Sequence, residues 1–394
     1  VRDMAAPEPH FVALPEAEAA FALPSGLFLY RLPGAAERPW LQRIAKISYT
    51  SGTTGRPKGV RLAQSAMDNV AQSLWAATAD LDLTKHLCLL PLATLLENVA
   101  GVYAPLRNGA AIGVPSLREI GFDGSNGLDV GRFMACIAQH RPHSVILLPQ
   151  TLAALVSALE AGAPRLDFLR FAAVGGARVP ESLLGRAERV GLPVYQGYGL
   201  TECASVVALS TPAERRAGSV GRVLPHARLR IGERSEIHVA GAAVCGYTGD
   251  ELAPDEIATG DIGSVDADGF LYVMGRRKNV FITSFGRNVC PDGAEADLTP
   301  APPIMQAALF GESRPWNVAV IVAPSTARAD EIQRAIDAVN RDLPDYARVH
   351  DWLRADEPFS ASNGLLTPNG RIRCEALWER YGARIDACFF DAIA

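Results

Sequence analysis

The sequence is poor in lysine and carries no excess of positive charge. Four of its 394 residues are lysine, Lys46, Lys58, Lys85 and Lys278, and arginine supplies the other positive side chains. The formal net charge is −5 and the pI is near 5.9. This balance gives no electrostatic basis for binding nucleic acid or an anionic membrane surface, so partners of that kind are not expected. Because lysine is so rare in this chain, each lysine that is present is a candidate for a functional role.

Long apolar runs and paired cysteines are also missing. The best candidate for a membrane span, residues 145–159, is interrupted by Pro149 and Gln150. The first residues show no basic segment followed by an unbroken apolar one, so no signal peptide is expected. The seven cysteines are scattered and form no C-x-x-C pair, which favours free thiols over a disulfide framework or a zinc site. These absences predict a cytoplasmic protein without an integral membrane segment.

Several common catalytic patterns are absent as well. The seven histidines form no H-x-H or H-E-x-x-H pattern, which speaks against a metal hydrolase. No G-x-S-x-G segment marks a serine hydrolase. The one glycine-rich loop of interest does not have the G-x-x-x-x-G-K-[ST] spacing of a P-loop, which argues against an NTPase of that class.

Strands and helices are expected to alternate through the first half of the chain. Short β-branched or apolar runs are followed by longer segments of helical periodicity. The expected strands are 45–50, 86–93, 110–115, 143–149, 170–176 and 193–199, and the expected helices are 64–81, 130–140, 151–162 and 180–191. This alternation predicts an α/β domain with largely parallel sheets.

The pattern changes after about Thr211. Short strands at 227–232, 235–241 and 269–276 are separated by Gly and Asp turns, which is typical of antiparallel sheet. A basic cluster within 275–291 then precedes a compact α+β unit. We therefore expect a large domain over residues 1–275, a boundary at 276–279 and a small C-terminal domain over 280–394.

The segment YTSGTTGRPKG, from Tyr49 to Gly59, combines glycines, hydroxyl side chains and a lysine. Glycines let the backbone approach phosphate oxygens closely, while hydroxyls and a lysine add hydrogen-bond donors and charge. The segment therefore suits a polyphosphate, although a surface turn would have a similar composition.

Two further segments carry groups suited to a nucleotide. In YQGYGLTE, Tyr198 can lie against a purine, Thr201 can donate to a phosphate, and Glu202 offers the hard oxygen ligand that Mg²⁺ accepts. In the segment TGD, Asp261 can accept hydrogen bonds from two ribose hydroxyls. A turn-capping aspartate is the alternative for Asp261.

These segments, together with GRRKNVFITSFGRNVCP, resemble the ordered motifs of the adenylate-forming superfamily, which contains acyl- and aryl-CoA synthetases, peptide-synthetase adenylation domains and luciferases. The resemblance runs from about Ala45 to Arg373. It implies a large α/β N-terminal domain of stacked mixed sheets with flanking helices and a small antiparallel subdomain, followed by a small mobile α+β C-terminal domain. It also implies that ATP and Mg²⁺ activate a carboxylic acid as an acyl-adenylate, and that CoA or the phosphopantetheine of an acyl carrier protein accepts the acyl group.

The resemblance also assigns residues. The β- and γ-phosphates fall to Thr50, Ser51, Gly52, Thr53, Thr54 and Lys58. The adenine and its surroundings fall to Gly175, Gly176, Ala177, Gln196, Gly197 and Tyr198. The α-phosphate, Mg²⁺ and ribose fall to Thr201, to Glu202, and to Asp261 with Arg276, respectively. Lys278 would be the interdomain hinge, and Gly286 would belong to the loop that approaches the pantetheine. The expected catalytic set is Lys58, Thr201, Glu202 and Arg371.

The acid substrate is less well defined by the sequence. The segment LPLATLLENVAG (90–101) resembles a region of long-chain acyl-CoA synthetases, with Thr94 where a histidine is usual. This segment and 145–149 are apolar. They are either walls of a pocket for a fatty or aryl acid or ordinary core strands.

The sequence departs from the superfamily pattern in two places. First, only residues 1–44 precede the strand that leads into the first motif, where the superfamily usually has a substantial subdomain, so the chain is either naturally short or a fragment. Second, Arg371 stands where a lysine is usual. Arginine keeps the charge but is planar and bulkier. Two hypotheses remain: an AMP-forming acid–thiol ligase in which Arg371 still serves, or a catalytically impaired nucleotide-binding or partner-binding relative of such a ligase.

Overall fold

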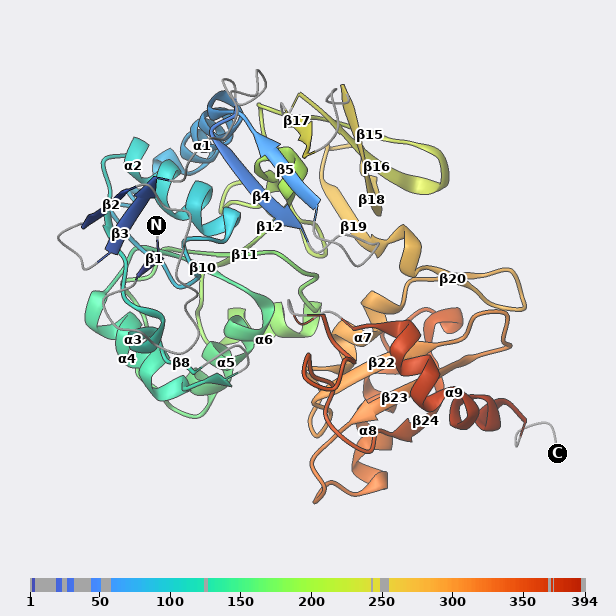
Figure 1. Ribbon diagram of the computed structural model, residues 1–394. Coiled ribbons are helices and arrows are strands. Elements are labelled where there is room, and N and C mark those ends of the chain that lie inside the picture. Colours follow the sequence, from blue (N-terminus) through green and yellow to red (C-terminus); the bar gives the residue numbers. More distant parts are fainter. Residues whose placement is uncertain are drawn as a thin grey trace. The chain divides into compact units, whose positions relative to one another are not determined.

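The computed structural model describes residues 2–3, 19–22, 27–31, 44–50, 58–123, 127–241, 244–248, 255–367, 370 and 372–390 (Figure 1). The chain forms two compact units, Val1–Ala45 and Lys46–Ala394. The first unit contains an antiparallel sheet of strand order β1-β3-β2. Its strands are β1 (Arg2–Asp3), β2 (Ala19–Ala22) and β3 (Leu27–Arg31).

The second unit is built on a seven-stranded sheet of order β14-β13-β12-β11-β10-β6-β7. The strands from β12 to β7 in this order are parallel, and β13 and β14 are antiparallel to their neighbours. The bounds are β6 (Lys85–Leu87), β7 (Ala111–Gly113), β10 (Ser144–Leu147), β11 (Phe171–Val174), β12 (Val194–Leu200), β13 (Ser205–Leu209) and β14 (Arg222–Val223).

Helices cover both faces of this sheet, which explains why a central strand such as β11 (FAAV) is apolar along its whole length. In β11, Phe171 packs in the cluster that contains α1, whereas Ala172 and Val174 pack in the cluster that contains α4, α5 and α6. Successive strand residues point to opposite faces, so each face receives an apolar layer. The helices are α1 (Gln64–Thr78), α2 (Ala104–Arg107), α3 (Leu117–Ile120), α4 (Val130–His140), α5 (Pro149–Glu160) and α6 (Glu181–Arg189).

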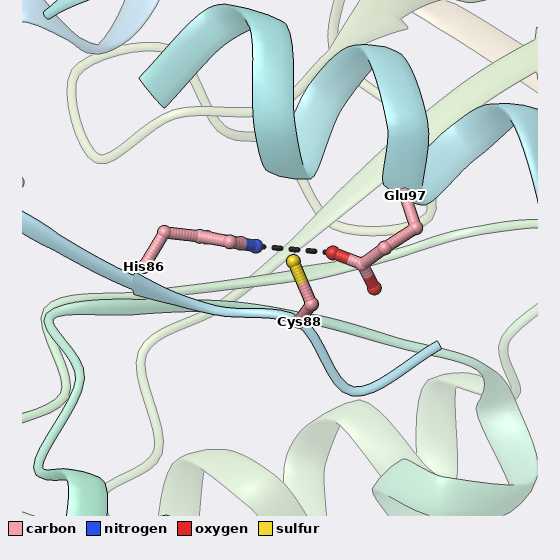
Figure 2. Close-up of side chains that lie close together, drawn as sticks. All are labelled: His86, Cys88 and Glu97. Atoms are coloured by element: carbon pink, nitrogen blue, oxygen red, sulfur yellow. Dashed lines mark hydrogen bonds and ion pairs between the residues drawn. The ribbon is translucent and has the colours of Figure 1, made fainter. Parts of the chain in front are cut away.

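The α1 face of the sheet also carries an unusual helical segment. The π-helical segment η3 (Glu97–Tyr103) leads directly into α2 and lies above β6. Figure 2 shows that the side chains of His86 and Cys88, at and just after β6, point toward Glu97 of η3. The π-helix is a rare element that is frequent at functional sites.

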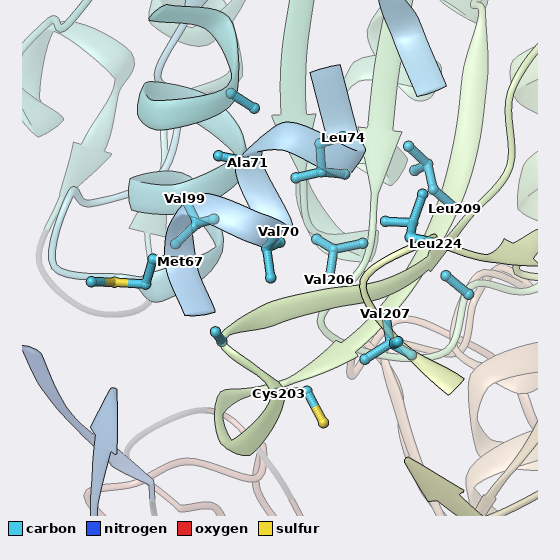
Figure 3. Close-up of a cluster of buried hydrophobic side chains, with 14 of the residues drawn as sticks. Met67, Val70, Ala71, Leu74, Val99, Cys203, Val206, Val207, Leu209 and Leu224 are labelled. Carbon is cyan, nitrogen blue, oxygen red and sulfur yellow. The ribbon is translucent and has the colours of Figure 1, made fainter. Parts of the chain in front are cut away.

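The core on the α1 face is continuous across several elements. Met67, Val70, Ala71 and Leu74 repeat with the spacing of one helix face, and they meet Val206 and other residues of β13 (Figure 3). The 15-residue helix α1 is thereby anchored directly after the β4–β5 hairpin.

Two smaller antiparallel sheets complete the large part of this unit. One has the order β15-β16-β18-β19 and the other the order β17-β5-β4. Their bounds are β15 (Arg228–Ile231), β16 (Glu236–Ala240), β18 (Glu256–Val265), β19 (Leu271–Arg276), β4 (Lys46–Thr50), β5 (Lys58–Leu62) and β17 (Val244–Tyr247). Short pairs and 3-10 turns are β8 (Phe122–Asp123), β9 (Gly127–Leu128), η2 (Ala79–Leu81), η4 (Thr201–Cys203) and η5 (Glu233–Ser235).

Beyond the 3-10 turn η6 (Arg277–Asn279), a three-stranded sheet of order β22-β23-β24 is packed between helices. Ala319 and Ile321 of β23 pack with α7 and α8, whereas Val318 and Val320 pack with α9. The elements are β20 (Phe281–Ile282), β21 (Asn288–Val289), α7 (Pro291–Leu298), β22 (Gln306–Phe310), β23 (Asn317–Val322), α8 (Ala329–Asn340), η7 (Asp345–Ala347), β24 (Val349–Arg354) and α9 (Cys374–Phe390).

The predicted α/β fold with an antiparallel part and a final α+β unit is confirmed. Two local predictions were wrong. The strand expected at 86–93 ends at Leu87, and the chain then leads into η3, so residues 90–101 are not a core strand. The glycine-rich segment 49–59 is not loop throughout, because Thr50 pairs with Lys58 and Tyr49 with Gly59 in a β4–β5 hairpin. Among the described residues, no helix is both long and apolar enough to cross a bilayer.

A pH-dependent term in stability arises from α7. Burial raises the pKa of Glu295 from 4.5 to about 8, although the Leu309 N–H donates to Oε1 at 2.9 Å. The folded state therefore binds the Glu295 proton more tightly than the unfolded state does. The resulting stabilisation is fully present below pH 4.5 and is lost as the pH rises through about 8. Glu295→Gln should gain stability relative to wild type between about pH 5 and 8.5 in urea unfolding. A difference that stays constant with pH would contradict this expectation.

Candidate functional site

A cavity of about 600 Å³ lies on the α1 face of the seven-stranded sheet. It extends from the carboxyl ends of β11 and β12 toward α1 and α2. The carboxyl edge of a parallel sheet is the usual place for a ligand, because loops and helix ends supply polar groups there. The lining at this edge includes Gly175, Gly176, Gly197, Tyr198, Thr201, Glu202 and Arg276.

Glycine is required at two points of this edge by close backbone approach. A Cβ on Gly199 would overlap the carbonyl oxygen of Ser205, where β12 and β13 meet at a bulge. A Cβ on Gly175 would lie 3.0 Å from the carbonyl oxygen of Gly197, and Gly176 adopts a φ of +82°. The absence of side chains leaves backbone atoms exposed to a flat ligand at this point.

The carboxylate of Asp261 joins two sheets beside the cavity. It is 5% exposed; the Tyr198 hydroxyl donates to Oδ2 at 2.7 Å and Arg276 Nε donates to Oδ1 at 2.8 Å. Tyr198 comes from β12, while Asp261 and Arg276 are paired residues of β18 and β19. Burial, and then the neighbouring charge of Asp261, raise the pKa of Tyr198 well above its usual range.

Thr201 and Glu202 occupy a tight turn after β12. They form the 3-10 turn η4, which is followed by Ala204 and Ser205 at positive φ of 56° and 113°. Non-glycine residues in this conformation store strain, which is commonly found at functional sites. The Tyr247 hydroxyl of β17 donates to Glu202 Oε1 at 3.2 Å, so the carboxylate is held at the cavity wall.

Besides Asp261, three further predicted residues of the described part of the chain do not line the cavity. Gln196 on β12 donates from Nε2 to the Ser219 carbonyl at 3.2 Å. Ala177 is exposed just beyond the Gly175–Gly176 turn. Gly286 is exposed at the tip of the β20–β21 turn with a φ of +71°.

Several predicted residues lie outside the part of the chain that the structure describes. These are Ser51, Gly52, Thr53, Thr54 and Arg371, and the side chains of Thr50, Lys58 and Lys278. The hairpin pairing of β4 with β5 nevertheless places both ends of the glycine-rich segment together. Tyr49, the first residue of the segment, lines the cavity.

The remainder of the cavity is mainly apolar. Thr94, Leu95, Leu96 and Ala100 line it from the segment 90–101, and Val145 and Ile146 line it from β10. Both segments that the sequence left open between pocket wall and core strand therefore contribute to the wall. Sequence reasoning missed Trp75 and Asn108, whose side chains bond to each other at 3.1 Å at the α1–α2 end.

A buried polar cluster also borders the cavity and was missed. Glu97 is fully buried and His86 is 2% exposed; His86 Nε2 lies 3.1 Å from Glu97 Oε1 and Nδ1 lies 2.9 Å from Ser144 Oγ. Burial, and then the charge of Glu97, raise the pKa of the nearby Cys88 thiol to about 12. The sequence signal that could have indicated this cluster is the H-x-C spacing at 86 and 88, because residues two apart in an extended segment point to the same face.

Comparison with protein-family models gives two matches. The model described as AMP-binding enzyme matches residues 7–246, and the model described as AMP-binding enzyme C-terminal domain matches residues 278–392. The first match alone spans more than half of the chain.

Curated relatives include two CoA ligases. The chain is 27% identical to the long-chain-fatty-acid–CoA ligase FadD15 of Mycobacterium bovis, over 88% of this chain and 69% of that protein. It is 32% identical to the indoleacetate–CoA ligase of Aromatoleum aromaticum, over 79% of this chain and 63% of that protein. The chain thus spans about two thirds of the length of these relatives.

Among solved structures, the fold is similar to that of O-succinylbenzoate coenzyme A synthetase from Bacillus subtilis in complex with ATP and magnesium ion. The TM-score is 0.64 at 25% identity, covering 80% of this chain and 67% of that one.

The Tyr198–Asp261 bond predicts a stability effect. Tyr198→Phe removes one donor from a buried carboxylate, so the free energy of unfolding should fall by about 1.5–3 kcal/mol. Urea unfolding measures this. The control, Tyr346→Phe, alters a tyrosine that is 41% exposed and should change stability by less than about 0.5 kcal/mol. Equal effects of the two changes would contradict the prediction.

Proposed function

This chain belongs to the family of AMP-binding enzymes, and we propose that it activates a hydrophobic carboxylic acid with ATP and transfers the acyl group to the thiol of CoA. The predicted membership of the adenylate-forming superfamily is confirmed. The observation that carries the proposal is the cavity, which joins a glycine-lined polar edge to a long apolar wall.

The polar edge suits a nucleotide. Gly175, Gly176 and Gly197 would offer backbone surface to adenine, and Arg276 with the adjacent Asp261 are the proposed partners of the ribose hydroxyls. The Tyr198 hydroxyl and Arg276 Nε hold the Asp261 carboxylate in place beside the cavity. Thr201 supplies a hydroxyl for the α-phosphate.

Magnesium fits the donor at this edge. Glu202 presents a hard carboxylate oxygen at the cavity wall, and Tyr247 orients it through the 3.2 Å bond to Oε1. When bound with ATP, the ion would neutralise phosphate charge. Lys58 and the hydroxyls of Thr50–Thr54 remain predicted ligands of the β- and γ-phosphates.

The chemistry requires a carboxylate to approach a polyphosphate of the same charge. The carboxylate oxygen attacks the α-phosphorus, the bond to the bridging oxygen breaks, and pyrophosphate leaves with that oxygen. The products are acyl-adenylate and pyrophosphate. A thiolate then attacks the acyl carbon and AMP leaves. The protein's proposed contribution to the first step is positioning and charge neutralisation by Thr201 and Lys58, with Asp261 and Arg276 holding the ribose.

The apolar wall favours a fatty or aryl acid. Leu95, Leu96, Ala100 and Ile146 provide no charged group to pair with a second carboxylate in this stretch of the cavity. The relatives named above act on acids of both kinds by their names, a long-chain fatty acid and indoleacetate. CoA is the proposed acceptor, and an acyl carrier protein is the alternative. A cytoplasmic location remains a prediction from the sequence.

Pyrophosphate release tests the proposal. Purified protein with ATP, Mg²⁺ and CoA should release pyrophosphate with at least one member of a panel of fatty and aryl acids. Glu202→Gln should lower the rate by about 10²-fold or more, because it removes the metal-binding charge. The control is Glu188→Gln, a side chain that is 69% exposed on α6. If the protein binds ATP but releases no pyrophosphate with any acid of the panel, the proposal is refuted.

Arg371 provides a separate prediction. If the arginine slows adenylation by its bulk, Arg371→Lys should raise the rate of acyl-adenylate formation several-fold, because the smaller ammonium fits a tighter site. Rapid-quench measurement of labelled acyl-AMP records the rate. Absence of adenylate in both proteins would instead support the impaired-relative hypothesis.

A further inference from the structure

Three different metal-ligand side chains converge beneath η3. A ring nitrogen of His86, the Cys88 thiol sulfur and a Glu97 carboxylate oxygen all lie within 4.8 Å of one another, and each residue is buried (Figure 2). His86 and Cys88 are two residues apart along one extended segment, so they point to the same side, and Glu97 reaches them from η3. The convergence therefore joins two elements of the fold.

The buried charge of this cluster favours a cation. Glu97 is 0% exposed, and a buried carboxylate is costly unless it is paired or coordinates a metal. Among the described residues, the nitrogen side chain bonded to it is His86, at 3.1 Å. A divalent ion held by neutral imidazole, thiolate and carboxylate would be electrically balanced, because the two anionic ligands match its charge.

The surroundings already hold the ligands in place. Ser144 Oγ lies 2.9 Å from His86 Nδ1, the ring nitrogen that faces away from Glu97. The Leu90 N–H donates to the second carboxylate oxygen of Glu97 at 2.9 Å. Metal-binding histidines usually have such a partner on the other ring nitrogen, which fixes the tautomer and ring orientation. The cluster thus has both ligands and supporting bonds.

The close approach of His86 and Glu97 requires a glycine at position 101. A Cβ on Gly101 would overlap Glu97 Oε1 and would lie 2.8 Å from His86 Nε2. Tetrahedral zinc keeps its ligand atoms roughly 3.3–3.6 Å apart, given bonds of about 2.0–2.3 Å. The imidazole and carboxylate are already close to that spacing, and all three ligand atoms lie within 4.8 Å of one another.

We propose that His86, Cys88 and Glu97 form a binding site for a divalent transition-metal ion, with zinc as the best match to the nitrogen, sulfur and oxygen donors. Three protein ligands leave a fourth coordination position for water or another small ligand. No zinc site was expected from the sequence, because its cysteines are scattered and form no C-x-x-C pair. The site is distinct from the proposed magnesium site at Glu202 and does not depend on the proposed ligase activity.

Metal uptake by the full chain, without ATP, acid or Mg²⁺, tests the site. Chelator-treated protein is dialysed against Zn²⁺ alone or Co²⁺ alone. Metal content is then measured by mass spectrometry, and thiolate-to-cobalt charge transfer by near-ultraviolet absorption. The variants are Cys88→Ser, Glu97→Gln and Ser144→Ala. The matched control is Cys136→Ser, which changes a thiol that is 6% exposed in the opposite core.

Wild type and Cys136→Ser should bind one ion per chain. Cys88→Ser should lose the charge-transfer band, and Glu97→Gln should weaken binding more than tenfold. Ser144→Ala should keep the band but bind about 10–100-fold more weakly, since it removes only the supporting bond. Wild type that takes up neither metal above a chelator-treated blank would overturn the proposal, and this arm does not depend on any variant folding. A thiolate-to-cobalt charge-transfer band of unchanged strength in folded Cys88→Ser would also overturn the proposal, because the thiolate would then not come from Cys88.

Discussion

The buried carboxylate of Asp261 is the constraint on which the candidate site depends. It receives the Tyr198 hydroxyl from the seven-stranded sheet and the Arg276 guanidinium from the smaller antiparallel sheet. A carboxylate with so little exposure needs both donors, because an unpaired buried charge costs several kcal/mol. The requirement fixes β12 against β18 and β19. The glycine-lined edge and Arg276 consequently face the same cavity.

This constraint also bears on the end of β19. Arg276 is the last residue of that strand and precedes the η6 turn at Arg277–Asn279, which contains the predicted hinge residue Lys278. The side chain of Arg276 is bound to Asp261, while its backbone N–H donates to Asp292 at 3.2 Å. Arg276 thus links β19 to Asp261 through its side chain and to α7 through its backbone, directly before the predicted hinge residue Lys278.

Much of the candidate site was visible in the sequence, because its residues come directly after strands. Gly175 and Gly176 succeed β11, and Thr201 and Glu202 succeed β12, so parallel pairing of these strands brings their ends to one edge. The turn residues and hydroxyl side chains at this edge are encoded by consecutive residues, so they can be identified from the sequence without knowledge of the tertiary structure. The parallel strand–helix alternation was equally local.

The features that escaped prediction depend on contacts between distant segments. The β5 strand forms because its residues pair with β4 and β17, although its sequence begins within a glycine-rich segment. The π-helix at Glu97 and the His86–Glu97 contact arise from packing between η3 and β6. No propensity of residues 90–101 indicates this geometry, since the same apolar run suits a strand.

The segment η3 contributes both to the wall of the cavity and to the buried cluster of His86, Cys88 and Glu97. Leu96 and Ala100, four residues apart, face the cavity, while Glu97 and Gly101, one step further around the helix, face His86. One short helix thus carries an apolar wall on one side and the buried polar cluster on the other. Because close-packed interiors transmit small displacements, the bonds that hold Glu97 also set the position of Leu96 and Ala100. The width of the proposed acid pocket is therefore determined in part by a cluster that need not contact the acid.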